Sequence, residues 1–126
     1  MGRGIAKIAA QAGSTVHLFD TNAQAATAAR EFIQSQWTRM VEKQRIGADD
    51  AQANANRLEI AGTLQELAGC DLIVEAIVER LEVKTSLFRE LETIIAPTAV
   101  LASNTSSLSI TAIAAGVKHP QRVVGF

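Results

Sequence analysis

The sequence has little of several residue types that mark specialised classes of protein. Tyrosine is absent, aromatic residues make up 4% of the chain, and there are one cysteine and two prolines among 126 residues. So few aromatic rings argue against a stacking surface for single-stranded nucleic acid. The single cysteine, Cys70, cannot form an internal disulfide, and the first residues show no secretory leader pattern. These absences predict a cytoplasmic protein.

A strong excess of charge and long apolar runs are also missing. The formal net charge is -1, which is neither basic enough to indicate nucleic-acid binding nor acidic enough to indicate disorder. No apolar run approaches the roughly 18 residues that a membrane span needs. Because 48% of the residues are nevertheless apolar, we expect one globular domain that binds neither nucleic acid nor membrane.

What the sequence does contain is a regular alternation of strand-like and helix-like segments. Short, nearly continuous apolar runs predict strands at 14–20, 58–62, 70–77, 99–103 and 122–126. Helical spacing predicts long helices at 22–44, 81–95 and 107–117, and shorter helical pieces at 2–12, 48–57 and 63–69. Since such strands are typical of a sheet covered on both faces, the pattern indicates an α/β fold with a parallel sheet.

Several residues are expected to fix the helix ends and the buried helix faces. Gly13 is a natural C-terminal cap for the first helix, Thr21 or Asn22 is the expected N-cap of the 22–44 helix, and Pro97 follows the end of the 81–95 helix. The 22–44 helix is expected to present one stripe consisting of Ala25, Ala29, Phe32, Gln36, Met40 and Lys43.

Polar side chains gather where the predicted strands end. These strand ends carry Asp20, Glu75, Glu79, Ser103, Asn104, Thr105 and Ser106. Ligands of open α/β sheets bind outside the carboxyl ends of the strands. The candidate chemistry is therefore expected at one edge of the sheet.

Gly2 and Asp20 fit part of a dinucleotide-binding pattern. Such folds use a final glycine that lets the first helix pack closely on the sheet, and an acid about 20 residues later that accepts hydrogen bonds from the adenosine ribose. A carboxylate at that place repels a 2'-phosphate, which favours NAD over NADP. The same two residues also fit an ordinary packed helix followed by a strand that ends on an acid.

Three segments carry a resemblance to a known family. The runs "MGRGIAKIAAQAGSTVHLFD", "DLIVEAIVERLEVKTSLFRELE" and "ASNTSSLSITAIAA" resemble the NAD-binding domain of the L-3-hydroxyacyl-CoA dehydrogenases, of the 3-hydroxybutyryl-CoA and 3-hydroxyadipyl-CoA type. This family acts in fatty-acid oxidation and in phenylacetate degradation. The resemblance extends over essentially the whole chain, and it implies a Rossmann-type doubly wound parallel sheet.

The resemblance also implies roles for residues on the cofactor side. Gly2 matches the last glycine of the fingerprint, and Asp20 matches the acid that binds the ribose. Glu79 and Lys84 match positions that contact NAD. Ser106 matches the serine between the nicotinamide and the carbonyl of the acyl-CoA.

On the substrate side, Asn104 is expected to help hold the loop that carries Ser106. Lys43 matches a position that touches coenzyme A. Gln36 and Glu82 stand where relatives carry other side chains that contact coenzyme A. The resemblance implies no metal.

The acidic and basic candidates also have purely structural interpretations. Glu75 and Glu79 are four residues apart and can form a solvated turn. Lys84 and Lys43 lie on predicted helices, where a lysine is usually solvated.

The serines allow a structural interpretation too. Ser106 can be the N-cap of the 107–117 helix, with Ser107 and Ser109 as alternatives. Capping and catalysis do not exclude each other at Ser106.

Neither histidine is placed to act as the general base that hydride transfer to or from a hydroxyl group requires. His17 lies inside a predicted strand, and His119 precedes Pro120 in a loop. The family's base and its glutamate partner follow the strand that "RVVGF" begins, and a helical domain for substrate binding and homodimerisation comes after them.

We therefore expect residues 1–126 to be a partial NAD-binding domain that lacks its first strand and is unstable and inactive alone. Two other functions fit the same residues. One is a non-enzymatic Rossmann-like nucleotide-binding module, and the other is a related dehydrogenase of hydroxy acids or sugar acids.

Overall fold

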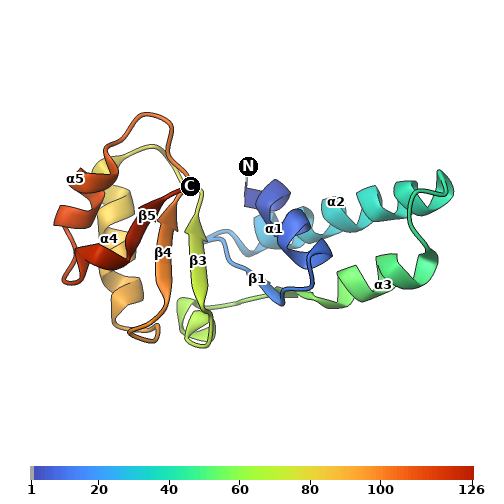
Figure 1. The fold of residues 1–126 in the computed structure, drawn as a ribbon, viewed down its shortest axis with the longest axis horizontal. Coiled ribbons are helices and arrows are strands. Elements are labelled where there is room, and N and C mark those ends of the chain that lie inside the picture. The colour runs from blue at the N-terminus through green and yellow to red at the C-terminus, as the bar shows by residue number, and fades with distance from the viewer. Residues whose placement is uncertain (1) are drawn as a thin grey trace. The chain divides into compact units, whose positions relative to one another are not determined.

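The computed structural model describes residues 2–126, which form two compact units that divide after Thr63 (Figure 1). Each unit contains its own parallel sheet, with strand order β1-β2 in the first and β3-β4-β5 in the second. The α/β class and the parallel strands are confirmed. The strands fall into two sheets rather than the one that the sequence predicts. A strand-helix-strand pattern predicts the direction of the strands, but it does not determine which of them share hydrogen bonds.

The first unit combines a two-stranded sheet with three helices. Its elements are α1 (Gly2–Gln11), β1 (Val16–Leu18), α2 (Ala23–Glu42), α3 (Ala48–Asn56) and β2 (Leu58–Ile60). Helices α2 and α3 lie side by side and are antiparallel (Figure 1). Both strands are short, and the register pairs Val16 with Leu58 and Leu18 with Ile60.

Both helix caps expected in this unit are present. Gly13 has a φ of 103°, and the N–H groups of Gly13 and Ser14 donate to the carbonyls of Ala10 and Ala9. This pattern is a Schellman motif, in which a glycine takes the left-handed conformation that other residues avoid. Asn22 caps α2, since its side chain accepts the N–H of Gln24 at 3.0 Å.

The predicted stripe of α2 is wrong. Among the residues of α2, the buried ones are Ala26, Ile33 and Trp37. Ile33 and Trp37 join Ala6, Ala10 and Leu58 in the core of the unit. Phe32 is 39% exposed, and the guanidinium of Arg3 lies 3.9 Å from the centre of its ring. The alanines of α2 point to several sides of the helix, so its sequence is compatible with more than one apolar stripe.

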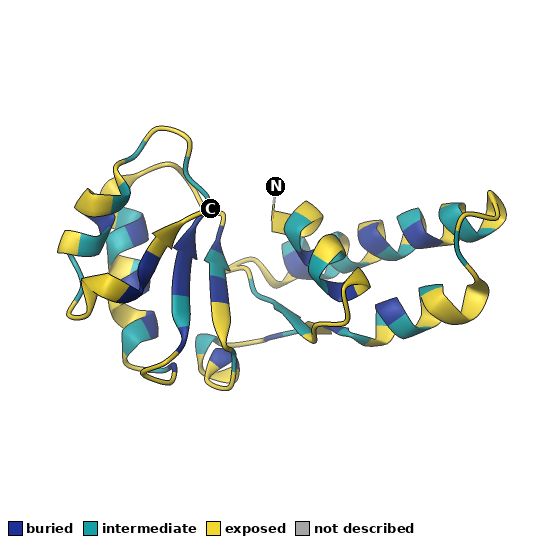
Figure 2. Cartoon of the chain, in the orientation of Figure 1, coloured by how far each residue is buried: buried dark blue, intermediate teal, exposed yellow. Residues whose placement is uncertain are grey.

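The second unit combines a three-stranded parallel sheet with helices α4 and α5. Its elements are η1 (Leu64–Leu67), β3 (Leu72–Glu75), α4 (Leu81–Glu92), β4 (Val100–Ser103), α5 (Ile110–Ala115), η2 (Pro120–Arg122) and β5 (Val123–Gly125). Buried residues lie on α4, β4 and α5, where Figure 2 is dark blue. The buried apolar ones include Phe88 and Leu91 from α4, Leu101 from β4 and Ile113 from α5.

Two helices of this unit are shorter than predicted. Helix α4 ends at Glu92, because the amides of Thr93 and Ile94 bond to carbonyls three residues earlier and tighten the last turn. Helix α5 begins at Ile110 rather than near residue 107, since the side chain of Ser109 accepts the N–H of Ala112 at 3.2 Å and acts as the N-cap. Within residues 2–126, no helix has the length and apolar character needed to cross a bilayer.

Candidate functional site

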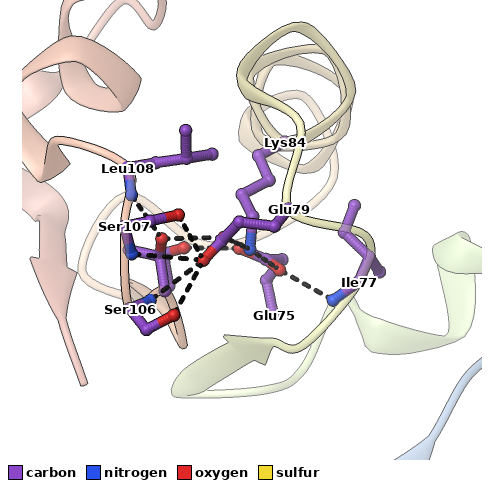
Figure 3. Close-up of polar contacts among 9 residues, drawn as sticks. Glu75, Ile77, Glu79, Lys84, Ser106, Ser107 and Leu108 are labelled. Atoms are coloured by element: carbon purple, nitrogen blue, oxygen red, sulfur yellow. Dashed lines mark hydrogen bonds and ion pairs between the residues drawn. The ribbon is translucent and has the colours of Figure 1, made fainter.

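The carboxyl ends of β3 and β4 bring an acid and a serine together. Glu75 and Ser103 are register partners on these adjacent parallel strands. The hydroxyl of Ser103 donates to Oε1 of Glu75 at 2.5 Å, and the N–H of Ile77 donates to Oε2 at 2.8 Å (Figure 3). Glu75 is only 3% exposed, so the expectation of a solvated turn is wrong for this residue.

Lys84, in the first half of α4, carries the opposite charge into the same place. Its Nζ lies 2.6 Å from Oε2 of Glu75 and 3.2 Å from Oε1 of Glu79. The Lys84 side chain is fully buried, which excludes the solvated interpretation of this lysine. A buried ammonium requires a charged partner, and Glu75 and Glu79 provide two.

Glu79 connects this buried pair to the loop that follows β4. Its carboxylate accepts the hydroxyl of Thr105 at 2.7 Å, the N–H groups of Ser106 and Ser107 at 3.0 and 3.3 Å, and both serine hydroxyls at 3.3 and 3.2 Å (Figure 3). The loop residues 105–107 are thus gathered around one carboxylate.

These contacts favour the ionised form of Glu79. The hydroxyl of Thr105, followed by the N–H of Ser106, lowers the pKa of Glu79 from 4.5 to about 2, and Lys84 and Ser107 contribute in the same direction. We call Glu75, Lys84 and Glu79 the charged cluster. With two carboxylates and one ammonium, the charged cluster holds one net negative charge next to an exposed group of hydroxyls.

Ser106 lies exposed in the loop and is not the N-cap of α5. Ser109 caps α5, so the capping interpretation of Ser106 is wrong. Ser106 is exposed, and Asn104 is half-buried. The N–H of Asn104 donates to the carbonyl of Glu75 at 2.9 Å, which fixes the start of the loop beside the end of β3.

The remaining predicted site residues belong to the first unit. Gly2 is the first residue of α1 and is exposed. Asp20 is exposed just after β1, and its Oδ1 accepts the N–H of Asn22 at 2.9 Å. Lys43 is exposed at the C-cap of α2. The roles of these three residues stay predictions.

The two positions where relatives carry other coenzyme A contacts differ in environment. Gln36 is half-buried on α2. Glu82 is exposed on α4, where the guanidinium of Arg80 lies 3.0 Å from its carboxylate.

The histidines lie where the sequence predicts them. His17 is within β1, where its Nδ1 is 3.5 Å from a carboxylate oxygen of Glu59. His119 is exposed before Pro120, and its N–H donates to Glu92 at 2.9 Å.

The sequence places Glu75, Ser103 and Thr105 at the strand ends where the site is expected, but it does not predict a role for any of them. One feature of the sequence indicates the buried ion pair, namely a glutamate at the end of an otherwise apolar strand. A lysine nine residues later, on the next helix, can reach this glutamate and neutralise it. The sequence alone could not show which serine of the next strand end is its partner.

The whole chain, residues 1–126, matches the family model described as "3-hydroxyacyl-CoA dehydrogenase, NAD binding domain". It is 43% identical to a probable 3-hydroxybutyryl-CoA dehydrogenase of Bacillus subtilis and 42% identical to the 3-hydroxyadipyl-CoA dehydrogenase of Escherichia coli. Each match covers 99% of this chain, but only 44% and 26% of the respective relative.

Solved structures agree with these relatives. A crystal structure of 3-hydroxybutyryl-CoA dehydrogenase from Escherichia coli is similar with a TM-score of 0.96 and 42% identity, and the match covers 99% of this chain and 26% of that one. The crystal structure of FadB2 from Mycobacterium tuberculosis is similar with a TM-score of 0.93 and 38% identity, over 99% of this chain and 44% of that one.

Proposed function

Since the chain belongs to the family of 3-hydroxyacyl-CoA dehydrogenase NAD-binding domains, we propose that it binds NAD as part of an enzyme that interconverts (S)-3-hydroxyacyl-CoA and 3-oxoacyl-CoA. The chain spans 44% and 26% of the two relatives named above, so the reaction belongs to a larger protein. The observation that carries the proposal is the loop of hydroxyl groups held by Glu79 at the carboxyl ends of β3 and β4.

The exposed polar groups fit a dinucleotide. Asp20 is exposed and charged, so its carboxylate can accept hydrogen bonds from the two hydroxyls of a ribose, and it disfavours the 2'-phosphate of NADP. Gly2, at the start of α1, leaves space for the backbone to approach a pyrophosphate. Glu79, with its side chain 34% exposed, completes the proposed cofactor contacts, and Lys84, whose side chain is fully buried, supports the cofactor only through Glu79.

Ser106 acts on the substrate and Asn104 on the loop in this proposal. The exposed hydroxyl of Ser106, which donates to Glu79 in this structure, turns to donate a hydrogen bond to the substrate oxygen that alternates between alcohol and carbonyl. Asn104 holds the loop in register with β3. When NAD is bound, its nicotinamide supplies the hydride acceptor, and we assign the general base to the part of the whole protein that follows Phe126.

A calorimetric titration tests the cofactor assignment. We expect NADH to bind with micromolar affinity and NADPH to bind far more weakly. Asp20→Asn is expected to weaken NADH binding about tenfold or more, since it removes a charge-assisted hydrogen bond. Asp49→Asn, which changes another exposed aspartate of the same unit, is the matched control. Absence of NADH binding to the whole protein would refute the proposal.

Lys43 is proposed to contact a phosphate of coenzyme A. In the whole protein, Lys43→Ala is expected to raise KM for a 3-oxoacyl-CoA while leaving KM for the matching N-acetylcysteamine thioester unchanged, because that thioester lacks the phosphates. Oxidation of NADH followed at 340 nm measures both. Equal effects on the two substrates would remove Lys43 from the coenzyme A site.

The separate sheets support a finer assignment of the fold. In the doubly wound order 3-2-1-4-5-6, the first strand lies between the second and the fourth. We infer that β1 and β3 are the second and fourth strands of that order, and that the whole protein also contains the first strand. Hydrogen exchange tests this: β1 and β3 amides should be better protected in a longer chain than in residues 1–126, and equal protection would contradict it.

A non-enzymatic nucleotide-binding module is the second candidate. It is favoured by one observation, namely that Glu79 satisfies the hydroxyls of the loop from within the chain. NADH binding by the whole protein without turnover of any 3-oxoacyl-CoA would support it.

A further inference from the structure

Glu75 has no role in the proposed contacts with cofactor or substrate. Its side chain is fully buried, so no ligand reaches it from solvent. It nevertheless accepts from three donors, which are the hydroxyl of Ser103, the N–H of Ile77 and the ammonium of Lys84. A buried carboxylate with this many donors is held in one position.

The position of Glu75 determines the position of Lys84. The two side chains are both completely buried and are joined at 2.6 Å, whereas Glu79 is farther from Nζ at 3.2 Å and its side chain is 34% exposed. Glu75 is therefore the partner that neutralises the ammonium, and Lys84 is free to offer another N–H to Glu79.

Glu79 in turn determines the position of the loop. Its carboxylate accepts the amides of Ser106 and Ser107, so a displacement of the carboxylate moves the backbone that carries the Ser106 hydroxyl. Glu79 thus acts on the loop directly, and Glu75 acts on it through Lys84 and Glu79.

We propose that Glu75 is a positioning residue, which neutralises and fixes Lys84 so that Lys84 holds Glu79, and Glu79 holds Ser106 and Ser107 in the geometry for binding. This inference rests on the proposed function, because the geometry it maintains is that of the proposed cofactor and substrate contacts.

Glu75→Gln isolates the charge of this residue. Glutamine has nearly the same shape, and its amide oxygen can still accept from Ile77 and Lys84 while its amide nitrogen donates to the hydroxyl of Ser103. The variant therefore keeps a hydrogen bond to each of the three partners, reverses the direction of the one to Ser103, and removes the negative charge beside Lys84. Ser103→Ala is the matched control, since it removes a hydrogen bond from the same carboxylate and leaves the charge.

The experiment compares these variants in the whole protein labelled with 15N-serine. In Glu75→Gln, the amide resonances of Ser106 and Ser107 are expected to move and to exchange faster with solvent, whereas in Ser103→Ala they stay in place. The Kd for NADH is expected to rise about tenfold in Glu75→Gln, the lower end of the effect of removing a group that orients a binding residue.

A double variant separates positioning from stability and covers the case in which Glu75→Gln does not fold. Glu75→Gln/Lys84→Met removes the buried ammonium together with its buried partner, so its Tm is expected to return toward the wild-type value. Its serine amides and its NADH affinity are expected to stay altered, because Glu79 has lost Lys84.

Wild-type serine amides in Glu75→Gln, or in the double variant, would overturn the inference. If the wild-type protein does not bind NADH, the proposed function fails, and the serine amides still decide whether Glu75 positions the loop.

Discussion

Gly116, the C-cap of α5, packs against Thr85 of α4, and adding a single methyl group there tests the packing that supports the site. A Cβ built on Gly116 lies 2.1 Å from Cγ2 of Thr85, more than 1 Å short of ordinary van der Waals contact. Thr85 is β-branched and restricted in χ1, so it cannot move away freely. The contact matters for function because Thr85 is next to Lys84 in α4.

The size of the effect follows from two opposing contributions. Forcing a methyl group into a packed contact costs about 1–3 kcal/mol. Gly116 has a φ of -86°, which alanine adopts without strain, so Gly116→Ala also recovers about 0.4–1 kcal/mol from the unfolded chain. We therefore expect a net loss of about 1–2 kcal/mol in the free energy of unfolding.

Urea denaturation measures this loss as a lower midpoint at an unchanged slope. Thr85→Ser removes the Cγ2 methyl, so the double variant Gly116→Ala/Thr85→Ser is expected to recover most of the loss. Gly69→Ala is the control, because nothing lies within 4 Å of a Cβ at Gly69. If Gly116→Ala alone is as stable as the wild type, or if Thr85→Ser does not rescue it, the packing argument is wrong.

Three further outcomes are expected. The carboxyl carbon of Glu79 should titrate in NMR with a pKa of about 2; because this pKa is below the ordinary 4.5, the Glu79 contacts stabilise the fold above pH 4.5 and lose that effect as the pH falls toward 2. A titration near 4.5 would show that the loop contacts are not formed. Ser109→Ala should cost about 0.5–2 kcal/mol of unfolding free energy as a lost N-cap, and an equal loss in Ser106→Ala would contradict the assignment of the cap to Ser109. Gly13→Ala should cost about 1–2 kcal/mol, because alanine is strained at a φ of 103°; wild-type stability would show that Gly13 does not hold this conformation.

The order of strands and helices could be predicted from the sequence, because it depends on local patterns. The run 70–77, which predicts a strand, is nearly continuous in apolar residues, and β3 forms within it. Gly13 and Asn22 mark helix ends because their conformations and hydrogen bonds involve only near neighbours. The family could be predicted as well, since its motifs lie in contiguous segments.

The stripe of α2 shows where local patterns are insufficient. A helix rich in alanine has several faces of similar apolar character, so its buried side depends on what it packs against. Trp37 and Ile33 face the core because α1 and β2 are there, and Phe32 remains outside under Arg3.

The sequence by itself determined the class of fold, the caps and the family of this protein, while the tertiary structure decided the charged cluster. A lysine in a helix is ordinarily solvated, and Lys84 is buried only because β3 and β4 bring Glu75 and Ser103 to the same strand ends. Burying a charge is unfavourable unless an opposite charge meets it, and that partner exists only once strand and helix are assembled. The loop depends on the same assembly, since Glu79 collects donors 26 to 28 residues away in the chain.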